Sequence, residues 1–156
     1  MKRLAAALEH KVPPPLIGAL CASLMWLICG MPPLTGRPPL LLVPALALVV
    51  LGLTVDAAGV LSFRRARTTV NPFAPERTVN IVSSGIYRLS RNPMYLGMAC
   101  ILTGWAVWLW QGRAVLGVVL FVAWITRFQI IPEERVLTQK FGTEYRQYRQ
   151  RVRRWV

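Results

Sequence analysis

Charged residues are strongly segregated along this chain of 156 residues. Within residues 12–63 the only charged side chains are Arg37 and Asp56, and within residues 92–126 only Arg113 interrupts the apolar sequence. The chain is 54% hydrophobic and 16% charged, whereas an ordinary soluble domain is about 45 to 50% apolar and about 25% charged. Long uncharged runs that alternate with basic clusters indicate an integral membrane protein.

Four apolar runs predict four transmembrane helices, at residues 14–31, 40–63, 93–110 and 114–131. A span needs about 20 residues at 1.5 Å each, so the last two runs are slightly short but sufficient. The tight turn at residues 111–113 joins these two runs into a helical hairpin. The predicted fold is all-α and integral to the membrane, with this C-terminal hairpin followed by a cytoplasmic amphipathic helix.

The basic residues predict the orientation in the membrane. All but two of the 19 Lys and Arg residues lie before the first run, between the second and third, or after the fourth; the exceptions are Arg37 and Arg113. The positive-inside rule therefore places both termini and the middle loop in the cytoplasm, in a membrane of the bacterial inner-membrane type. Residues 9–11 are Glu, His and Lys, and no small-residue cleavage site follows the first run, so we expect no cleavable signal peptide.

A net charge of +13 raises the question of nucleic acid binding. The basic residues are the collars that membrane insertion requires, and no nucleic-acid-binding motif accompanies them, so we expect the lipid bilayer as partner and no nucleic acid. Cys21, Cys29 and Cys100 lie inside the apolar runs without metal-ligand spacing, and His10 is the only histidine. We therefore expect neither a metal site nor a disulfide. The sequence carries no indication of oligomeric state.

The pattern divides the chain into a two-helix membrane scaffold, residues 1–63, and a catalytic core, residues 64–156, within one structural domain. Asp56 is the exception in the scaffold, because an acid at this depth is costly to bury. It is expected to form an ion pair with Arg64 or Arg127, to contact a ligand, or to extend towards the headgroups. Residues 64–84 are expected to form a lid or floor at the membrane surface.

A polar hinge at residues 85–97 opens the third apolar run. Asn92 followed by Pro93 is typical of a helix start, with the Asn side chain capping free amides and Pro at the first helical position. Arg91 lies just outside this start, beside the positive end of the helix dipole. Both features favour an anion at the hinge.

Pro132 is likewise suited to a first helical position, with Glu133 and Glu134 in the first turn. After it, apolar and aromatic residues recur at spacings of three and four, which predicts one face of an amphipathic helix: Leu137, Phe141, Tyr145, Tyr148, Val152 and Trp155. Gly142 and Thr143 are expected to divide that helix, with Thr143 capping the second part. This segment is expected to lie on lipid headgroups or to fold back over the bundle.

Both predicted helix starts lie at the cytoplasmic surface by this topology, one beside Arg91 and the other with Glu133 and Glu134. A pocket between them would offer a site for a carboxylate and acceptors for an ammonium group and sugar hydroxyls. Its aromatic walls would be Tyr87, Tyr95, Tyr145 and Tyr148. Such a pocket would suit a zwitterionic ligand that carries an adenine.

The sequence GIYRLSRNPMYLG at residues 85–97, the hairpin, PEERVL at 132–137 and FGTEYRQY at 141–148 together resemble the isoprenylcysteine carboxyl methyltransferase and phospholipid methyltransferase superfamily. The resemblance covers about the C-terminal half of the chain. It implies that S-adenosylmethionine binds on the cytoplasmic side, between the hairpin and the C-terminal segment. It also implies methyl transfer to a lipophilic acceptor.

Carried over position by position, the resemblance implies a cofactor pocket formed by Arg91, Asn92, Pro93, Tyr95, Gly97, Glu133, Glu134, Tyr145 and Tyr148. Asn92 replaces the commoner histidine of that motif, so a hydrogen bond to the cofactor is expected there but no imidazole chemistry. Tyr145 and Tyr148 have an alternative interpretation as packed tyrosines on an amphipathic face.

The acceptor is left open among a phospholipid amine, an isoprenylcysteine-type carboxylate and a smaller thiol or acid. Only an amine needs to lose a proton, and Asp56, Glu133 or Glu134 could take it; the candidate catalytic residues are Asp56, Arg127 and Glu134. One alternative function is an NADPH-dependent sterol-type reductase. Such reductases typically carry an Asp-Glu pair with a cysteine soon after it, whereas this chain has Glu133 and Glu134 and no such cysteine. The other is a non-enzymatic membrane anchor or assembly subunit.

Overall fold

A computed structural model describes residues 9, 11–35, 38–66 and 80–156. These residues form helices and turns and contain no strand, which confirms the all-α fold class. The elements are α2 (Pro14–Ile28), α3 (Pro39–Arg65), the 3-10 helix η2 (Gly85–Arg88), α4 (Pro93–Leu109), the 3-10 helix η3 (Gly112–Ala114), α5 (Val115–Ile125), the π-helical turn η4 (Thr126–Ile130) and α6 (Ile131–Arg151). Most of the predicted lid or floor, residues 67–79, lies outside the described residues.

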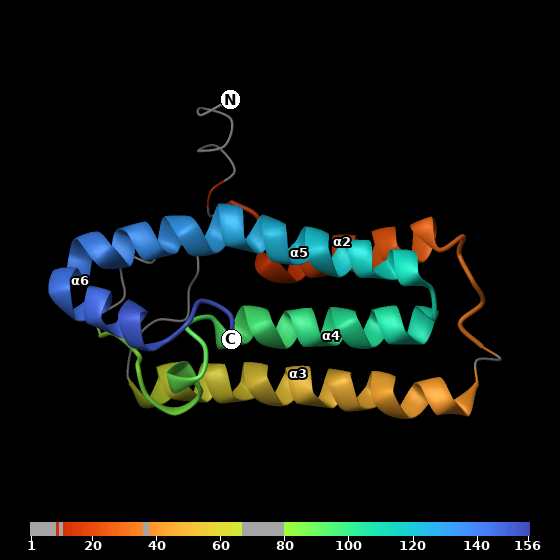
Figure 1. Cartoon of the computed structure of the whole chain (residues 1–156), viewed down its shortest axis with the longest axis horizontal. Coiled ribbons are helices and arrows are strands. Elements are labelled where there is room, and N and C mark those ends of the chain that lie inside the picture. Colours follow the sequence, from red (N-terminus) through yellow and green to blue (C-terminus); the bar gives the residue numbers. More distant parts are fainter. Residues whose placement is uncertain (1–8, 10, 36–37, 67–79) are drawn as a thin grey trace.

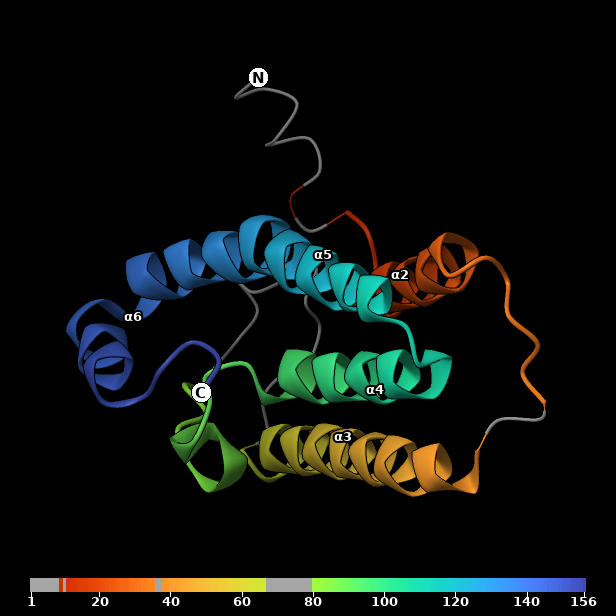
Figure 2. The ribbon, with the colours of Figure 1, turned by 45° about the vertical axis from the view of Figure 1, so that its right-hand side comes forward.

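The four apolar helices pack as a bundle in which α4 is the inner member (Figure 1). One side of α4 lies along α3, and the other side lies against α2 and α5, as the turned view also shows (Figure 2). The side chains that are completely buried between α2, α4 and α5 include Met25, Leu109, Phe121 and Ile125. The hairpin predicted from residues 111–113 is therefore formed, with η3 in the turn.

Among the described residues, two helices are long and apolar enough to cross a membrane, α3 and the continuous helix Gly112–Arg151. The other two apolar helices, α2 and α4, have 15 and 17 residues. The outer face of α3 exposes large apolar side chains such as Leu40 and Val43, 83% and 72% exposed, which suits contact with hydrocarbon. The helix α2 ends before the predicted residue 31 because Gly30 and Met31 adopt positive φ and their amides bond back to Leu27 and Trp26.

Glycines allow α3 and α4 to approach closely. A β carbon added at Gly52 or Gly97 would collide with the backbone of the other helix, and one added at Gly104 would collide with the carbonyl oxygen of Ala45. Small residues at such contacts let backbones meet in an apolar environment, where packing rather than the hydrophobic effect holds helices together. The contact also brings Asp56 of α3 directly over Gly97 of α4.

The helix start predicted at Pro132 is wrong. The helix α5 runs through the π-helical turn η4 into α6 without a break, so no free amides are exposed at Pro132. A π-helical turn adds one residue to the helix, and such turns accommodate a proline that cannot donate a backbone hydrogen bond. The extra residue also rotates the face that α6 presents by about 100° relative to a regular helix.

The division of α6 at Gly142 is confirmed. Gly142 has φ 54° and ψ −117°, a backbone conformation outside the helical region that glycine adopts readily. The chain therefore turns at Gly142, and residues 143–151 return along the bundle towards the start of α4 (Figure 1). The aromatic face of this returning segment packs against Ile81, Leu137 and Phe141, so the segment folds back over the bundle.

Candidate active site

One cavity of about 810 Å³ lies where the ends of α2, α3 and α4 meet α6. This volume is in the usual range for small-molecule sites, about 300 to 1,000 Å³. Its polar half, next to the hinge, is lined by Asn80, Tyr87, Arg91, Asn92, Tyr95, Glu133, Tyr145 and Tyr148. Its apolar half, deeper in the bundle, is lined by Gly18, Ala19 and Ala22 of α2, Asp56 of α3, and Met98, Ile101 and Leu102 of α4.

Arg91 supplies positive charge to the polar half. Its side chain is 8% exposed, and its Nη1 lies 2.9 Å from Oε1 of Glu134. Neither Nη1 nor Nε has a hydrogen bond of acceptable geometry among the described residues. A buried guanidinium with unused donors that also lines a cavity is a suitable partner for a ligand carboxylate.

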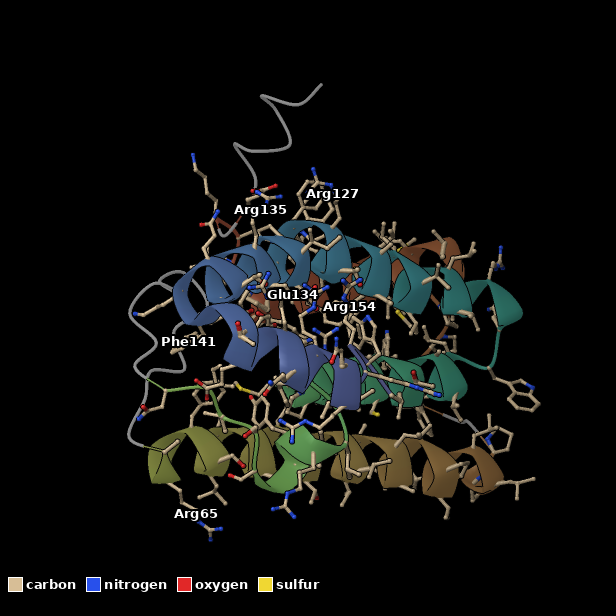
Figure 3. All side chains as sticks on the ribbon, turned by 60° about the vertical axis from the view of Figure 1, so that its left-hand side comes forward. Arg65, Arg127, Glu134, Arg135, Phe141 and Arg154 are labelled. Atoms are coloured by element: carbon tan, nitrogen blue, oxygen red, sulfur yellow. The ribbon has the colours of Figure 1, made fainter. Side chains whose placement is uncertain are left out.

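Glu134 forms the ion pair with Arg91 but does not itself line the cavity. Arg154 binds Glu134 through two hydrogen bonds, Nε to Oε1 at 3.0 Å and Nη2 to Oε2 at 2.7 Å, and Arg149 lies 3.9 Å from Oε2. Figure 3 shows Glu134 and Arg154 side by side between α6 and the rest of the bundle. The hydrogen bond to Glu134 raises the pKa of Arg154. This buried carboxylate is neutralised by arginines and positions Arg91.

Glu133, the preceding residue, lines the cavity and is half-buried. Burial, and secondly the carboxylate of Glu134, raise the pKa of Glu133 to about 7. Arg91, Arg149 and Arg154 pair with Glu134 and not with Glu133. A carboxylate that the protein leaves incompletely neutralised beside a cavity favours a cationic ligand group.

Four tyrosines form the aromatic walls that the sequence predicted, and all four are buried, with Tyr95 the most exposed at 9%. The hydroxyl of Tyr148 donates a 2.8 Å hydrogen bond to the carbonyl oxygen of Tyr87, which joins α6 to the hinge. The rings of Tyr145 and Tyr148 are 6.1 Å apart. Burial raises the pKa of Tyr145 to about 12, so its hydroxyl stays protonated and remains a hydrogen-bond donor at neutral pH.

The last residues of the chain bind the hinge, and we call residues 152–156 the C-terminal strap. The amide of Arg91 donates to the carbonyl oxygen of Arg153 at 3.0 Å, and the side-chain amide of Asn92 donates to that of Arg154 at 2.9 Å. The indole of Trp155 donates to the hydroxyl oxygen of Thr126 at 3.2 Å. The strap therefore joins the hinge to the end of α5.

The strap also corrects the role predicted for Asn92. Asn92 precedes the first turn of α4, but its side chain makes no capping hydrogen bond. The side-chain amide is engaged by the carbonyl oxygen of Arg154 instead, and the backbone amide of Asn92 donates to the Ser90 hydroxyl oxygen at 3.1 Å. The expected helix start at Pro93 is confirmed without the expected cap.

The ion pair predicted for Asp56 is absent among the described residues. Arg127 points outward and pairs with Glu9 at 3.1 Å, and it does not line the cavity (Figure 3). Arg64 lies exposed at the end of α3. The Oδ1 atom of Asp56 is buried without a hydrogen-bond partner in the described part of the chain, and the residue lines the apolar half of the cavity.

Two other predicted site residues lie behind the cavity wall. Pro93 is completely buried at the start of α4. Gly97 faces α3, where a β carbon would collide with Asp56 and with the carbonyl oxygen of Gly52. Neither residue lines the cavity, so each shapes it through the backbone.

Sequence reasoning missed two groups of residues. The C-terminal strap had no distinguishing signal, because Arg153 and Arg154 belong to a run of similar arginines. The residues of α2 did carry a signal, the small side chains of Gly18, Ala19 and Ala22, but this pattern predicts helix contact as readily as a cavity. The cavity is lined by residues of both predicted parts, the scaffold at residues 1–63 and the catalytic core at residues 64–156. The division into these two parts stays a prediction.

Comparison with known proteins gives two kinds of match. The sequence pattern of the phospholipid methyltransferase family matches residues 40–144, which include α3, the hinge, the hairpin and the start of α6. An "Uncharacterized protein" of Haemophilus influenzae is 51% identical over 63 residues, which are 40% of this chain and all of that protein.

Plant proteins match a longer part of the chain. A "Probable protein-S-isoprenylcysteine O-methyltransferase" of Oryza sativa subsp. indica is 32% identical over 108 residues, 69% of this chain and 56% of that protein. "Protein-S-isoprenylcysteine O-methyltransferase A" of Arabidopsis thaliana is 31% identical over 108 residues, 69% of this chain and 54% of that protein. The chain thus spans about half the length of these plant relatives. No solved structure matches the chain.

Proposed function

We propose that this chain, which belongs to the phospholipid methyltransferase family, is an S-adenosylmethionine-dependent methyltransferase that acts on a lipophilic acceptor at the cytoplasmic face of a membrane. The plant relatives are named as methyltransferases of protein S-isoprenylcysteine, which is a lipophilic acceptor. Two long apolar helices and an outward apolar face on α3 support placement in the membrane. The distribution of Lys and Arg supports the cytoplasmic face for the hinge.

The observation that carries the proposal is the pair of opposite charges on the wall of the polar half. Arg91 offers unused guanidinium donors, and Glu133 offers a carboxylate that no arginine binds among the described residues. A methionine-derived ligand carries a carboxylate, an ammonium group and, in the methyl donor, a sulfonium. These groups complement Arg91 and Glu133, so the residues present fit the cofactor.

The remaining polar residues have roles that follow from their positions. Tyr87, Tyr95, Tyr145 and Tyr148 provide flat apolar walls and hydroxyl groups for an adenosine, and Asn92 borders the same space. Glu134 lies outside the cavity and acts through Arg91. We therefore propose Arg91, Asn92 and Glu133 with the four tyrosines as cofactor contacts, and Pro93, Gly97 and Glu134 as residues that position them.

When bound, S-adenosylmethionine would supply an electrophilic methyl group on a positively charged sulfur. The protein then has to hold donor and acceptor in line and exclude water, because the charge on sulfur disappears in the reaction. The buried tyrosines and the C-terminal strap close the polar half on the side of α6. The apolar half would accommodate the hydrocarbon chain of an acceptor.

The direct experiment is calorimetric titration of the purified protein in nanodiscs with S-adenosylmethionine, S-adenosylhomocysteine and NADPH. Both adenosyl ligands are expected to bind with micromolar to sub-millimolar affinity, and NADPH is expected not to bind. No heat with either adenosyl ligand at millimolar concentration, in a sample that unfolds cooperatively on heating, would sink the proposal. Heat with NADPH alone would favour the reductase alternative.

A further inference from the structure

The apolar half of the cavity contains one charged group. Apart from Asp56, its walls are small or apolar side chains from α2 and α4, namely Gly18, Ala19, Ala22, Met98, Ile101 and Leu102. A second hollow of about 410 Å³ shares the wall residues Ala22, Ile101 and Leu102 with it and lies between α2, α3 and α4, next to Trp105 and Trp108. The apolar half and this hollow are walled by hydrocarbon, and Asp56 is the single acid among these wall residues, at the hinge-side end.

Asp56 marks the boundary between the two halves. Its Oδ1 lies against Gly97, which is four residues after Pro93 and thus about 6 Å along α4 from the hinge. Beyond that level the α4 residues that line the space are Met98, Ile101 and Leu102. A molecule with its chain in the apolar half would therefore place its polar end beside Asp56, next to the polar half.

Asp56 lacks the internal partners that other polar groups of α3 have. The hydroxyl of Thr54 donates to the carbonyl oxygen of Val50 at 2.7 Å, and that of Ser62 donates to Ala58 at 2.8 Å. The Oδ1 atom of Asp56 has no hydrogen bond and the carboxylate has no ion pair within the described residues. An acid in apolar surroundings is costly without a partner, and a ligand that brings a cation or a donor removes this cost.

This charge discriminates among the acceptors that the sequence left open. A carboxylate or thiolate acceptor would bring a second negative charge next to Asp56, whereas a protonated amine would bring the opposite charge. Arg91, a buried cation on the cavity wall, lies in the polar half, where it is assigned to the carboxylate of the cofactor. We propose that the acceptor is a lipophilic amine and that Asp56 is the residue that selects it; this rests on the proposed methyltransferase function.

Asp56 can also take the proton that an amine has to lose. The ammonium group transfers one proton to the Asp56 carboxylate, and the freed nitrogen lone pair forms a bond to the methyl carbon of the donor. The bond from that carbon to sulfur breaks, and its electron pair stays on sulfur as a neutral thioether. The product is a methylated ammonium, and Asp56 releases its proton to water, so one proton is produced for each methyl group transferred.

Binding tests the selection without turnover. Octylammonium and octanoate share one chain and differ in charge, so each is titrated by calorimetry into the protein in nanodiscs with saturating S-adenosylhomocysteine, with empty nanodiscs as the blank. We expect octylammonium to bind at least tenfold more tightly than octanoate. The preference should disappear in Asp56→Asn, which keeps the size of the side chain, and persist in Glu9→Gln, which removes a negative charge outside the cavity.

Turnover tests the proton transfer. With labelled methyl donor, we expect methylation of octylamine but not of octanoate or octanethiol. In Asp56→Asn, kcat/KM for octylamine should fall about 100-fold or more, the usual effect of removing a general base. Methylation of octanoate or octanethiol in preference to octylamine would overturn the inference. Equal binding of octylammonium by the wild type and Asp56→Asn would overturn it too.

The proposed function and the role of Asp56 fail separately. If S-adenosylhomocysteine does not bind the wild type, the proposed function fails. If it binds the wild type and Asp56→Asn equally but octylammonium shows no preference over octanoate, only the role of Asp56 fails. Retained S-adenosylhomocysteine binding in Asp56→Asn also shows that the variant is folded.

Discussion

The polar and apolar halves of the cavity are held together by different means. In the polar half, residues about sixty positions apart are joined by directional bonds, such as Asn92 to Arg154 and Tyr148 to Tyr87. In the apolar half, α3 and α4 meet through glycines, and the single acid, Asp56, has no hydrogen bond on Oδ1 among the described residues. This difference is what we expect if the polar half is a preorganised site for the proposed cofactor and the apolar half takes the chain of the proposed acceptor, with Asp56 left to meet its polar end.

The largest expected effect falls on the polar half. Arg91→Gln removes the guanidinium that we propose binds the ligand carboxylate, while Glu134 keeps its two hydrogen bonds from Arg154. Removing a charge-assisted interaction from a buried site costs about 3 kcal/mol, so S-adenosylhomocysteine should bind about 100-fold more weakly by calorimetry.

Arg127→Gln is the matched control for Arg91→Gln, because Arg127 pairs with Glu9 outside the cavity. Its affinity for S-adenosylhomocysteine should stay within about twofold of the wild type, as expected for an exposed ion pair. An equal loss of affinity in both variants would mean that net charge, and not the position of Arg91, governs binding.

The next effect falls on the apolar half. Gly97→Ala places a methyl group against Asp56 and the backbone of Gly52, so the helices must separate. Overpacking of this kind costs about 1 to 3 kcal/mol, and we expect a clear fall in the unfolding temperature measured by scanning fluorimetry. Gly112→Ala, where no atom lies within 4 Å of the added carbon, should leave that temperature unchanged. Equal shifts in the two variants would refute close packing at Gly97.

The two halves also differ in what the sequence can predict. The hinge, the opposed charges and the tyrosines follow from local rules, because helix starts, charge patterns and aromatic spacing are readable within about ten residues. The partner of Asn92 cannot be predicted from local sequence, because Arg154 lies 62 positions away and nothing distinguishes it from its neighbouring arginines. The expected cap was wrong for that reason, since tertiary contacts override local capping preferences.

The errors at Asp56 and Pro132 both come from tertiary structure. The predicted pairing of Asp56 with Arg127 failed because α3 packs mainly against α4, while Arg127 of the π-helical turn η4 points away from the cavity to Glu9. The same turn carries the helix through Pro132, where a helix start was expected. A change of about 100° in the direction of a helix face is invisible in a pattern of apolar residues.

A smaller effect is expected from pH. Glu133 has a pKa raised to about 7, and only its ionised form attracts the ligand cation, so affinity should fall as pH falls through 7. For a single group of this pKa whose neutral form binds about tenfold more weakly, S-adenosylhomocysteine should bind about fivefold more weakly at pH 6 than at pH 8. Glu133→Gln should bind weakly at both pH values, and a wild-type slope that persists in this variant would assign the pH dependence to another group.

The smallest effect should come from the bond that joins α6 to the hinge. Tyr148→Phe removes the hydrogen bond to the carbonyl oxygen of Tyr87 but keeps the ring in the wall. A neutral hydrogen bond contributes about 1 kcal/mol, so the unfolding temperature should fall by a few degrees. An unchanged unfolding temperature would show that this hydrogen bond does not hold the polar half closed.

One measurement tests most directly whether the polar half binds the cofactor and the apolar half does not. S-adenosylhomocysteine is titrated by calorimetry, at pH 8, into the wild type, Glu133→Gln and Asp56→Asn in the same nanodiscs. Both variants neutralise one carboxylate on the wall of one cavity. We predict about tenfold weaker binding for Glu133→Gln and unchanged binding for Asp56→Asn. Equally weakened binding in both variants, or weakened binding in Asp56→Asn alone, would contradict this division.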